Sequence, residues 1–249
     1  MNFLRSLLYV SLLILTVIPW SFVVCASVVL DKPRRYRLAQ VYTRLAIELG
    51  RLICGIGYRV EGWHHLPDAE AIVMCKHQSA WETLWVQAFL PRRMAFVYKR
   101  ELHRLPFFGW AMAALGMISI DRSRGQDAFE QVVTQGTEHL HDGWWIMMFP
   151  EGTRTPPGST KRYKTGGARL AARTGAKIIP IAVNSGECWP RNAFVKTPGE
   201  ITVSILPVID PAGKTADEIG AAVESAIETE MRRLAPHRYS GPYVPSSSN

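Results

Sequence analysis

The stretch "WWIMMFPEGTR", residues 144 to 154, decides the fold. It opens with six large apolar residues and then changes to a proline, a carboxylate, a glycine, a hydroxyl and a guanidinium. A short apolar run that stops at turn residues is typical of a buried strand. The polar side chains would then lie just beyond the carboxyl end of that strand, and they are Glu151, Gly152, Thr153 and Arg154.

Five more apolar runs of strand length occur along the chain and alternate with helical patterns. The expected strands are 71–75, 94–98, 116–120, 144–149, 177–183 and 201–206, and the expected helices are 81–89, 107–115, 127–141, 166–174 and 216–234. This alternation is typical of an α/β fold with a mainly parallel sheet flanked by helices. We therefore expect an α/β domain over residues 59–240 and a flexible tail over residues 241–249.

Four of the expected strands are followed closely by polar or charged side chains. The four clusters are residues 76–79, 99–100, 121–122 and 151–154. In open α/β sheets, ligands bind beyond the carboxyl ends of the strands. If the four strands are parallel neighbours, the clusters face one crevice, which Arg122 and Arg154 would make cationic.

The N-terminal segment predicts a membrane anchor. Residues 6–30 carry no charge and are rich in Leu, Val and Ile, so they are long enough to cross a hydrocarbon core of about 30 Å. Basic side chains are dense in residues 32–37, which places the following domain on the cytoplasmic side of the inner membrane. A cleaved signal peptide and a buried helix are the alternatives. Residues 38–52 repeat apolar side chains at helical spacing, so we expect residues 1–58 to form an anchor and an amphipathic helix.

The composition points to an anionic partner but does not choose one. The formal net charge is +8, which suits nucleic acid, an acidic membrane surface or a phosphorylated substrate. The four cysteines are far apart in the sequence and match no metal or disulfide spacing. His64 and His65 are adjacent, without an HExxH pattern, so no metal site is indicated. The glycine-rich phosphate loops of nucleotide-binding folds do not occur either.

The stretch "KHQSAWET", residues 76–83, carries the best candidate for a catalytic base. His77 and Glu82 can meet if the histidine lies in a loop and the glutamate in the first helical turn that follows. Glu82 would accept a hydrogen bond from Nδ1 of His77 and leave Nε2 free to take a proton from a substrate hydroxyl. Ser79 and Glu82 also fit a capping box, so Glu82 has a structural alternative. No GxSxG motif surrounds Ser79, which disfavours a covalent acyl-enzyme.

The turn at residues 150–154 suits an anionic ligand. Arg154 can bind a phosphate or a carboxylate through two hydrogen bonds, and Gly152 with Thr153 lets backbone donors approach an anion. Glu151 would repel a bare anion, so it either holds Arg154 or accepts a hydrogen bond from a ligand hydroxyl. A structural turn with a local ion pair is the alternative.

Four motifs in fixed order resemble the sequence blocks of the glycerolipid acyltransferases. They are "HQSAWE" at 77–82, "GMISIDR" at 116–122, "FPEGTR" at 149–154 and "IIPIAV" at 178–183. Within this family the chain looks most similar to the bacterial 1-acyl-sn-glycerol-3-phosphate acyltransferases. One departure is Glu82, where many members have aspartate, and its extra methylene can be absorbed by the choice of rotamer.

The resemblance implies direct acyl transfer without an acyl-enzyme. His77, oriented by Glu82, would deprotonate the 2-hydroxyl of lysophosphatidic acid, which attacks the thioester of acyl-CoA or acyl carrier protein and gives phosphatidic acid. Arg122, Glu151 and Arg154 would belong to the glycerol-phosphate pocket. The implied partners are these substrates and membrane lipid, with no metal, cofactor or nucleic acid. The alternatives are acylation of another lysolipid, such as a lyso-ornithine lipid, and a non-catalytic membrane protein that binds anionic lipid.

Overall fold

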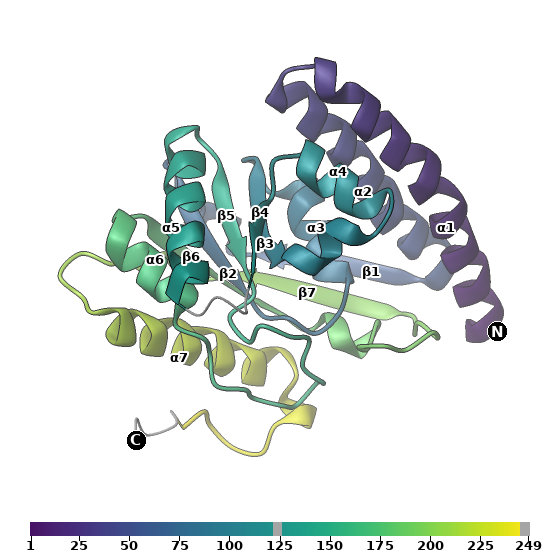
Figure 1. Ribbon diagram of the computed structural model, residues 1–249. Coiled ribbons are helices and arrows are strands. Elements are labelled where there is room, and N and C mark those ends of the chain that lie inside the picture. Colours follow the sequence, from purple (N-terminus) through teal and green to yellow (C-terminus); the bar gives the residue numbers. More distant parts are fainter. Residues whose placement is uncertain (122–125, 245–249) are drawn as a thin grey trace.

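A seven-stranded sheet forms the centre of the computed structural model, which describes residues 1–121 and 126–244. The strands lie in the order β1-β7-β6-β2-β5-β3-β4 (Figure 1). Their bounds are β1 Ile56–Glu61, β2 Ala71–Cys75, β3 Met94–Lys99, β4 Ile118–Ile120, β5 Trp145–Met148, β6 Lys177–Val183 and β7 Gly199–Ile205. Neighbouring strands are parallel except for β6 and β7. The predicted α/β fold with a mainly parallel sheet is therefore confirmed.

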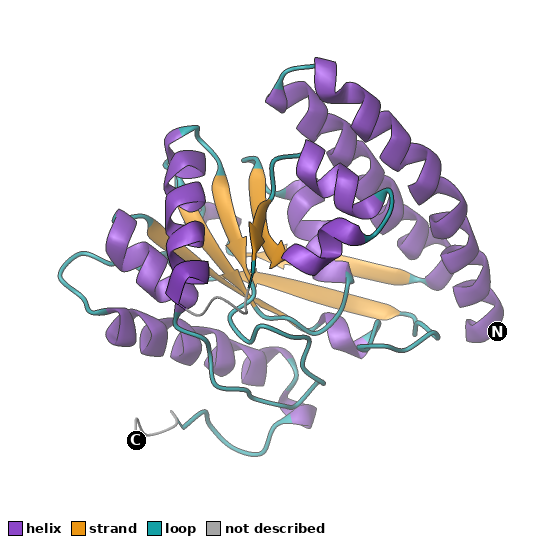
Figure 2. Cartoon of the chain, viewed as in Figure 1, coloured by secondary structure: helices purple, strands orange, loops and turns teal. Residues whose placement is uncertain are grey.

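Helices flank this sheet in two groups, as Figure 2 shows in purple around the orange strands. Their bounds are α1 Asn2–Ala26, α2 Lys32–Cys54, α3 Trp81–Phe89, α4 Phe108–Ala114, α5 Gln126–His141, α6 Gly166–Thr174 and α7 Ala216–Leu234. In Figure 1, α1 to α4 gather on one side of the molecule and α5 to α7 on the other. The helices α3, α6 and α7 have the bounds that the sequence predicts.

The central strand β2 explains why the sequence pattern works. All five of its side chains are buried, and a strand covered on both faces reads as a continuous apolar run. β2, β5, β3 and β4 are adjacent and parallel, so their carboxyl ends meet at one edge of the sheet. The polar residues that follow β2, β3 and β5 therefore face a common edge, as expected.

The start of the sheet differs from the expected domain boundary at residues 58 and 59. α2 ends at Cys54, and Gly55 takes the left-handed conformation with φ of 70° that commonly ends a helix. β1 then begins at Ile56. It is an edge strand paired with β7. Its residues mix glycine, arginine and partly exposed side chains, so they form no continuous apolar run and the sequence pattern does not predict this strand. At the other end of the chain lies the segment expected to be a flexible tail, residues 241–249. Within its described part, Tyr243 donates from Oη to Glu224 on α7 at 2.6 Å.

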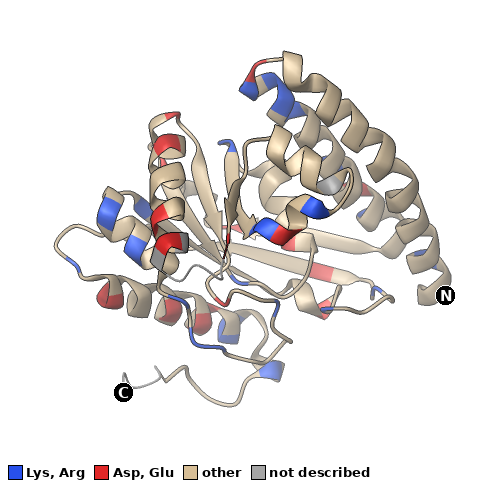
Figure 3. Cartoon of the chain, in the orientation of Figure 1, with Lys and Arg blue, Asp and Glu red and all other residues tan. Residues whose placement is uncertain are grey.

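The two N-terminal helices form a hairpin, visible in purple and blue in Figure 1. α1 is long and apolar enough to cross a membrane, by length and composition. It also packs along α2, where Tyr9 donates to the carbonyl of Ala46 at 3.0 Å and Trp20 donates to that of Leu38 at 3.1 Å. Charged residues are sparse on α1 in Figure 3. Its outer face exposes large apolar side chains, among them Phe3, Leu4, Leu8, Ile14, Leu15 and Phe22.

Candidate active site

His77 lies in the loop between β2 and α3, two residues beyond the strand. Its Nδ1 is 2.8 Å from Oε1 of Glu82, which sits in the first turn of α3. The imidazole also stacks on the ring of Phe149, with 3.7 Å between centroids and 15° between planes. Loop and helix thus bring the two predicted residues together, and the phenylalanine restricts the ring from one side.

The carboxylate of Glu82 is buried and receives several hydrogen bonds. Oε1 accepts from the backbone N–H groups of Gln78 and Ser79, both at 2.8 Å, besides His77. Oε2 accepts from the hydroxyls of Ser79 at 2.8 Å and Ser185 at 2.6 Å. Burial alone would raise the pKa of Glu82, but the hydrogen bonds from His77, Ser185 and Ser79 bring it below its ordinary value. The carboxylate is therefore ionised and favours the tautomer of His77 that donates from Nδ1.

The two roles that the sequence offers for Glu82 coexist in this structure. One oxygen, Oε1, accepts both from Nδ1 of His77 and from the backbone of Ser79. The predicted capping box is incomplete, because α3 begins at Trp81 with Ala80 as its N-cap. Ala80 already has helical dihedral angles, and the hydroxyl of Ser79 accepts from the Trp81 N–H at 2.8 Å. The glutamate therefore orders the loop as well as the histidine.

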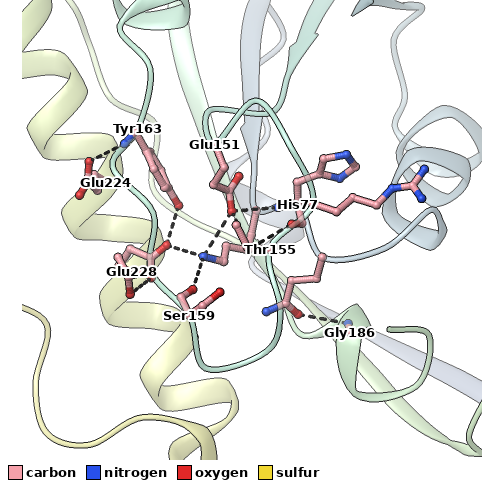
Figure 4. Close-up of polar contacts among 12 residues, drawn as sticks. His77, Glu151, Thr155, Ser159, Tyr163, Gly186, Glu224 and Glu228 are labelled. Carbon is pink, nitrogen blue, oxygen red and sulfur yellow. Dashed lines mark hydrogen bonds and ion pairs between the residues drawn. The ribbon is translucent and has the colours of Figure 1, made fainter. Parts of the chain in front are cut away.

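Glu151 is also fully buried, in the turn after β5. Its Oε1 is 3.3 Å from Nζ of Lys76 and accepts from the backbone N–H of His77 at 3.3 Å. Figure 4 shows these contacts together with Thr155, whose hydroxyl lies 3.4 Å from the same oxygen. Burial raises the pKa of Glu151, and the ammonium of Lys76 opposes that effect. The ion pairs of the described residues join Glu151 to Lys76 and not to Arg154, so the expected local pair is not formed.

The rest of the turn depends on a glycine. Gly152 has φ of 67°, a left-handed conformation that disfavours a side chain, and a Cβ there would lie 2.8 Å from Cε of Lys164, at the movable end of a flexible side chain. Thr153 and Arg154 are partly exposed, and the carbonyl of Arg154 accepts a hydrogen bond from Arg191 at 2.9 Å. The other predicted arginine, at position 122, lies outside the residues that the structure describes.

A cavity of about 1010 Å³ opens beside this loop and is lined by His77, Phe149 and Gly152. One group of its lining residues is apolar and comes from α1, α2, α4 and β3, including Trp20, Phe96 and Met112. A second group is basic and comes from the approach to α6 and from α6 itself, namely Arg162, Lys164 and Arg169. Such a cavity suits a ligand that has both a hydrocarbon chain and an anionic group.

Several residues of the site are not among those predicted from the sequence. Ser185 follows β6, which is parallel to β2, so it lies beyond a strand end like the predicted clusters. A single neutral hydroxyl, however, does not by itself indicate a site. Lys76 belongs to a predicted polar cluster, yet its complete burial is the opposite of what a lysine usually shows. Phe149 reads as the last residue of a strand, and its contact with His77 depends on the turn that follows.

The chain is similar to known acyltransferases. Residues 57–184 match the family model described as Acyltransferase. The chain is 37% identical over 240 residues to the 1-acyl-sn-glycerol-3-phosphate acyltransferase of Pseudomonas aeruginosa, which covers 94% of this chain and 92% of that protein. It is 32% identical over 178 residues to the human 1-acyl-sn-glycerol-3-phosphate acyltransferase alpha, over 70% of this chain and 62% of that protein.

The crystal structure of the 1-acyl-sn-glycerophosphate (LPA) acyltransferase PlsC from Thermotoga maritima has the same fold. Its TM-score is 0.77 at 23% identity, over 94% of this chain and 95% of that chain. The family model and the P. aeruginosa relative together establish more than the fold, because the match extends through the motif blocks at residues 77–82 and 149–154. This chain therefore belongs to the acyltransferase family and is an acyltransferase.

Proposed function

We propose that this enzyme moves a fatty acyl group from acyl-CoA or acyl carrier protein to the 2-hydroxyl of lysophosphatidic acid, giving phosphatidic acid. The observation that carries the proposal is the 2.8 Å contact between His77 and the buried Glu82, at the wall of a cavity with apolar and basic lining. The name of the P. aeruginosa relative, 37% identical to this chain, supports the same acceptor.

His77 is the general base in this mechanism. Its Nδ1–H is held by Glu82, so the lone pair of Nε2 takes the proton of the acceptor hydroxyl while the hydroxyl oxygen attacks the thioester carbon. The negative charge of Glu82 stabilises the imidazolium that forms. The C–S bond then breaks, and the leaving thiolate takes the proton back from His77. The ester product and a free thiol remain, and the base is restored.

The serines near His77 support direct attack instead of an acyl-enzyme. The hydroxyls of Ser79 and Ser185 both donate to Oε2 of Glu82. Neither hydroxyl therefore donates to the imidazole, which is the contact that activates a nucleophilic serine. The only hydroxyl that the base needs to activate in this mechanism is that of the acceptor.

The cavity lining supports an assignment of the parts of the substrates. Apolar side chains such as Trp20 and Met112 form a wall for an acyl chain, and Arg162 with Lys164 lies where an anionic headgroup would be stabilised. We keep Thr153 and Arg154 as further phosphate contacts, because they follow Gly152 in the same turn. Glu151 has a different part, because its buried carboxylate supports the backbone of His77.

We further propose that α1 and α2 hold the enzyme on the cytoplasmic face of the inner membrane. α1 exposes an apolar face, and α2 beside it carries Arg44 and Arg51. Because guanidinium groups are costly inside hydrocarbon, a hairpin that includes them lies along the interface more readily than it crosses the bilayer.

The decisive experiment uses membranes that contain this protein, radiolabelled acyl-CoA, and lysophosphatidic acid beside a panel of other lysolipids. We expect labelled phosphatidic acid from the wild type and about a 1000-fold lower rate from His77→Ala, which should stay in the membrane fraction. Label found only in the acylated product of a lyso-ornithine lipid would assign that lysolipid as the acceptor in place of lysophosphatidic acid. Transfer with acyl carrier protein alone would settle the donor. Turnover of His77→Ala at the wild-type rate would refute the mechanism.

A further inference from the structure

A buried lysine next to the proposed base has no part in the mechanism above. Lys76 precedes His77, and its side chain is completely buried. Its Nζ lies 2.6 Å from Oε1 of Glu228 and 3.3 Å from Oε1 of Glu151, and it donates to the carbonyl of Ser159 at 3.2 Å. The three N–H groups of one ammonium therefore have three acceptors. Figure 4 shows Glu151, Ser159 and Glu228 gathered at this point.

The acceptors of Lys76 come from three separate parts of the chain. Glu151 belongs to the turn after β5, Ser159 to the loop that follows, and Glu228 to the C-terminal helix α7. Tyr163, farther along the same loop, donates from Oη to Glu228 at 3.0 Å. A single ammonium thus fastens that loop and α7 to the residue before the proposed base.

The link continues to His77 through one carboxylate. Oε1 of Glu151 faces Nζ of Lys76 and also accepts from the backbone N–H of His77. Burial opposes the charge of Lys76, but Glu151 and Glu228 together raise its pKa above the ordinary value. Two buried carboxylates therefore share one cation, and each limits how strongly the other is held.

We propose that Lys76 is a positioning residue for acyl transfer, which holds Glu151 against the backbone of His77 while Glu228 competes for the same ammonium. The proposal rests on the function proposed for His77. It gives α7 a share in the active site, although no cavity-lining residue within the described chain belongs to that helix. Lys76 itself does not touch the substrate, because its side chain is completely buried and does not line the cavity.

Other charged and titratable groups lie around the cluster of Glu151, Lys76 and Glu228. They are Cys75 at the end of β2, Tyr163 in the loop, Lys164 above Gly152, Arg232 beside Glu228 on α7, and Tyr239 beyond α7. Burial and the neighbouring carboxylates raise the pKa of Cys75 and of Tyr163, so these two groups stay neutral at physiological pH. The ion pairs of the described residues leave Lys76 as the cation bound to Glu151.

The test compares the pH dependence of kcat for Lys76→Met and Glu228→Gln with that of the wild type, in membranes, with lysophosphatidic acid as acceptor. In this proposal, protonation of Glu151 weakens its hold on the backbone of His77 and so contributes to the acidic limb of the kcat profile. Lys76→Met removes the cation that keeps the proton off Glu151, so this limb should move to higher pH. Glu228→Gln leaves the ammonium to Glu151 alone, so the acidic limb should move to lower pH. At neutral pH, Lys76→Met should lower kcat about 10- to 100-fold, whereas Glu228→Gln should keep most of it.

Glu224→Gln is the matched control. Glu224 lies one turn before Glu228 on α7 and accepts from the backbone of Tyr163 at 3.1 Å, but it makes no contact with Lys76. Its removal should leave both kcat and the acidic limb unchanged. If the substitutions only loosened packing, the kcat profiles of all three variants would be lower. The acidic limbs of Lys76→Met and Glu228→Gln would then not move in opposite directions.

A second variant keeps the test decisive if Lys76→Met does not fold. Lys76→Met combined with Glu228→Gln removes one charge of each sign and avoids an unpaired buried carboxylate at position 228. We expect this double variant to fold, with its acidic limb still at raised pH. A wild-type kcat and pH profile in the double variant, or limbs that shift in the same direction in the single variants, would overturn the proposal. A different lysolipid acceptor would overturn the assigned substrate only, and the same comparison would then be run with that acceptor.

Discussion

Replacing Glu82 with glutamine would remove a buried negative charge while keeping the shape of the side chain. Two backbone N–H groups, from Gln78 and Ser79, point at Oε1, so the amide should turn its oxygen to them and keep accepting from Nδ1 of His77. Its NH2 group would then face the hydroxyls of Ser79 and Ser185, which can rotate to accept. The tautomer of His77 is thereby preserved, and the missing charge is the main change.

The size of the effect follows from the short contact between the two side chains. Unit charges about 4 Å apart interact by about 4 kcal/mol at an effective dielectric constant near 20. The remaining neutral hydrogen bond offsets about 1 kcal/mol of this loss. A loss of about 3 kcal/mol of stabilisation for the imidazolium corresponds to about a 100-fold lower kcat.

The assay is single-turnover acyl transfer at saturating acceptor, for the wild type, Glu82→Gln and a capping control. Glu218→Gln is that control, because Glu218 forms a complete capping box with Thr215 at the start of α7. Its kcat should stay within about twofold of wild type. If Glu82→Gln lost no more activity than Glu218→Gln, then Glu82 would only order the loop, and its role toward His77 would be refuted.

Three further predictions concern the same site. Gly152→Ala should lower the thermal midpoint and raise the acceptor KM, because φ of 67° penalises a Cβ by about 1–3 kcal/mol; calorimetry and steady-state kinetics would check both, and an unchanged midpoint would show that the turn relaxes. Arg154→Ala should raise the KM of a phosphorylated acceptor more than that of the acyl donor, and equal changes would remove Arg154 from the phosphate site. The folded-state pKa of Glu82 lies below its ordinary value of 4.5, so its contribution to stability should be present above that pH and lost as pH falls through the lowered pKa; urea titrations of wild type and Glu82→Gln should therefore converge in acid, and a difference that grows in acid would contradict the lowered pKa.

The sequence predicts the elements that lie in the middle of the fold better than those at its edge. β2 and β6 are continuous apolar runs because both their faces are covered, and α7 has a capping box and a regular apolar stripe. β1 is an edge strand with partly exposed side chains, so its pairing with β7 supplies the information that its residues lack. Secondary structure at such an edge is set by the neighbouring strand.

The candidate site shows a similar limit. His77 and Glu82 could be paired from their spacing and chemistry, because the contact joins residues five positions apart. Lys76 and Glu228 are 152 positions apart, and neither has a local pattern that indicates an ion pair or burial. Ser185 reaches Glu82 only because β6 lies beside β2 in the sheet. Contacts across the sheet and onto α7 depend on topology, which one sequence does not display.

α1 packs against the rest of the protein on one side as well as exposing an apolar face on the other. Ser6 accepts from the backbone N–H of Lys196 at 2.8 Å, and the ring of Tyr9 contacts Trp189 with 5.6 Å between centroids. Trp20 and Val24 of the same helix form part of the cavity wall. An enzyme from which this helix had been removed would therefore lose part of the cavity wall. If α1 holds the enzyme on the membrane, as proposed, solubility and turnover cannot be engineered independently, since the same helix also encloses the proposed substrate cavity.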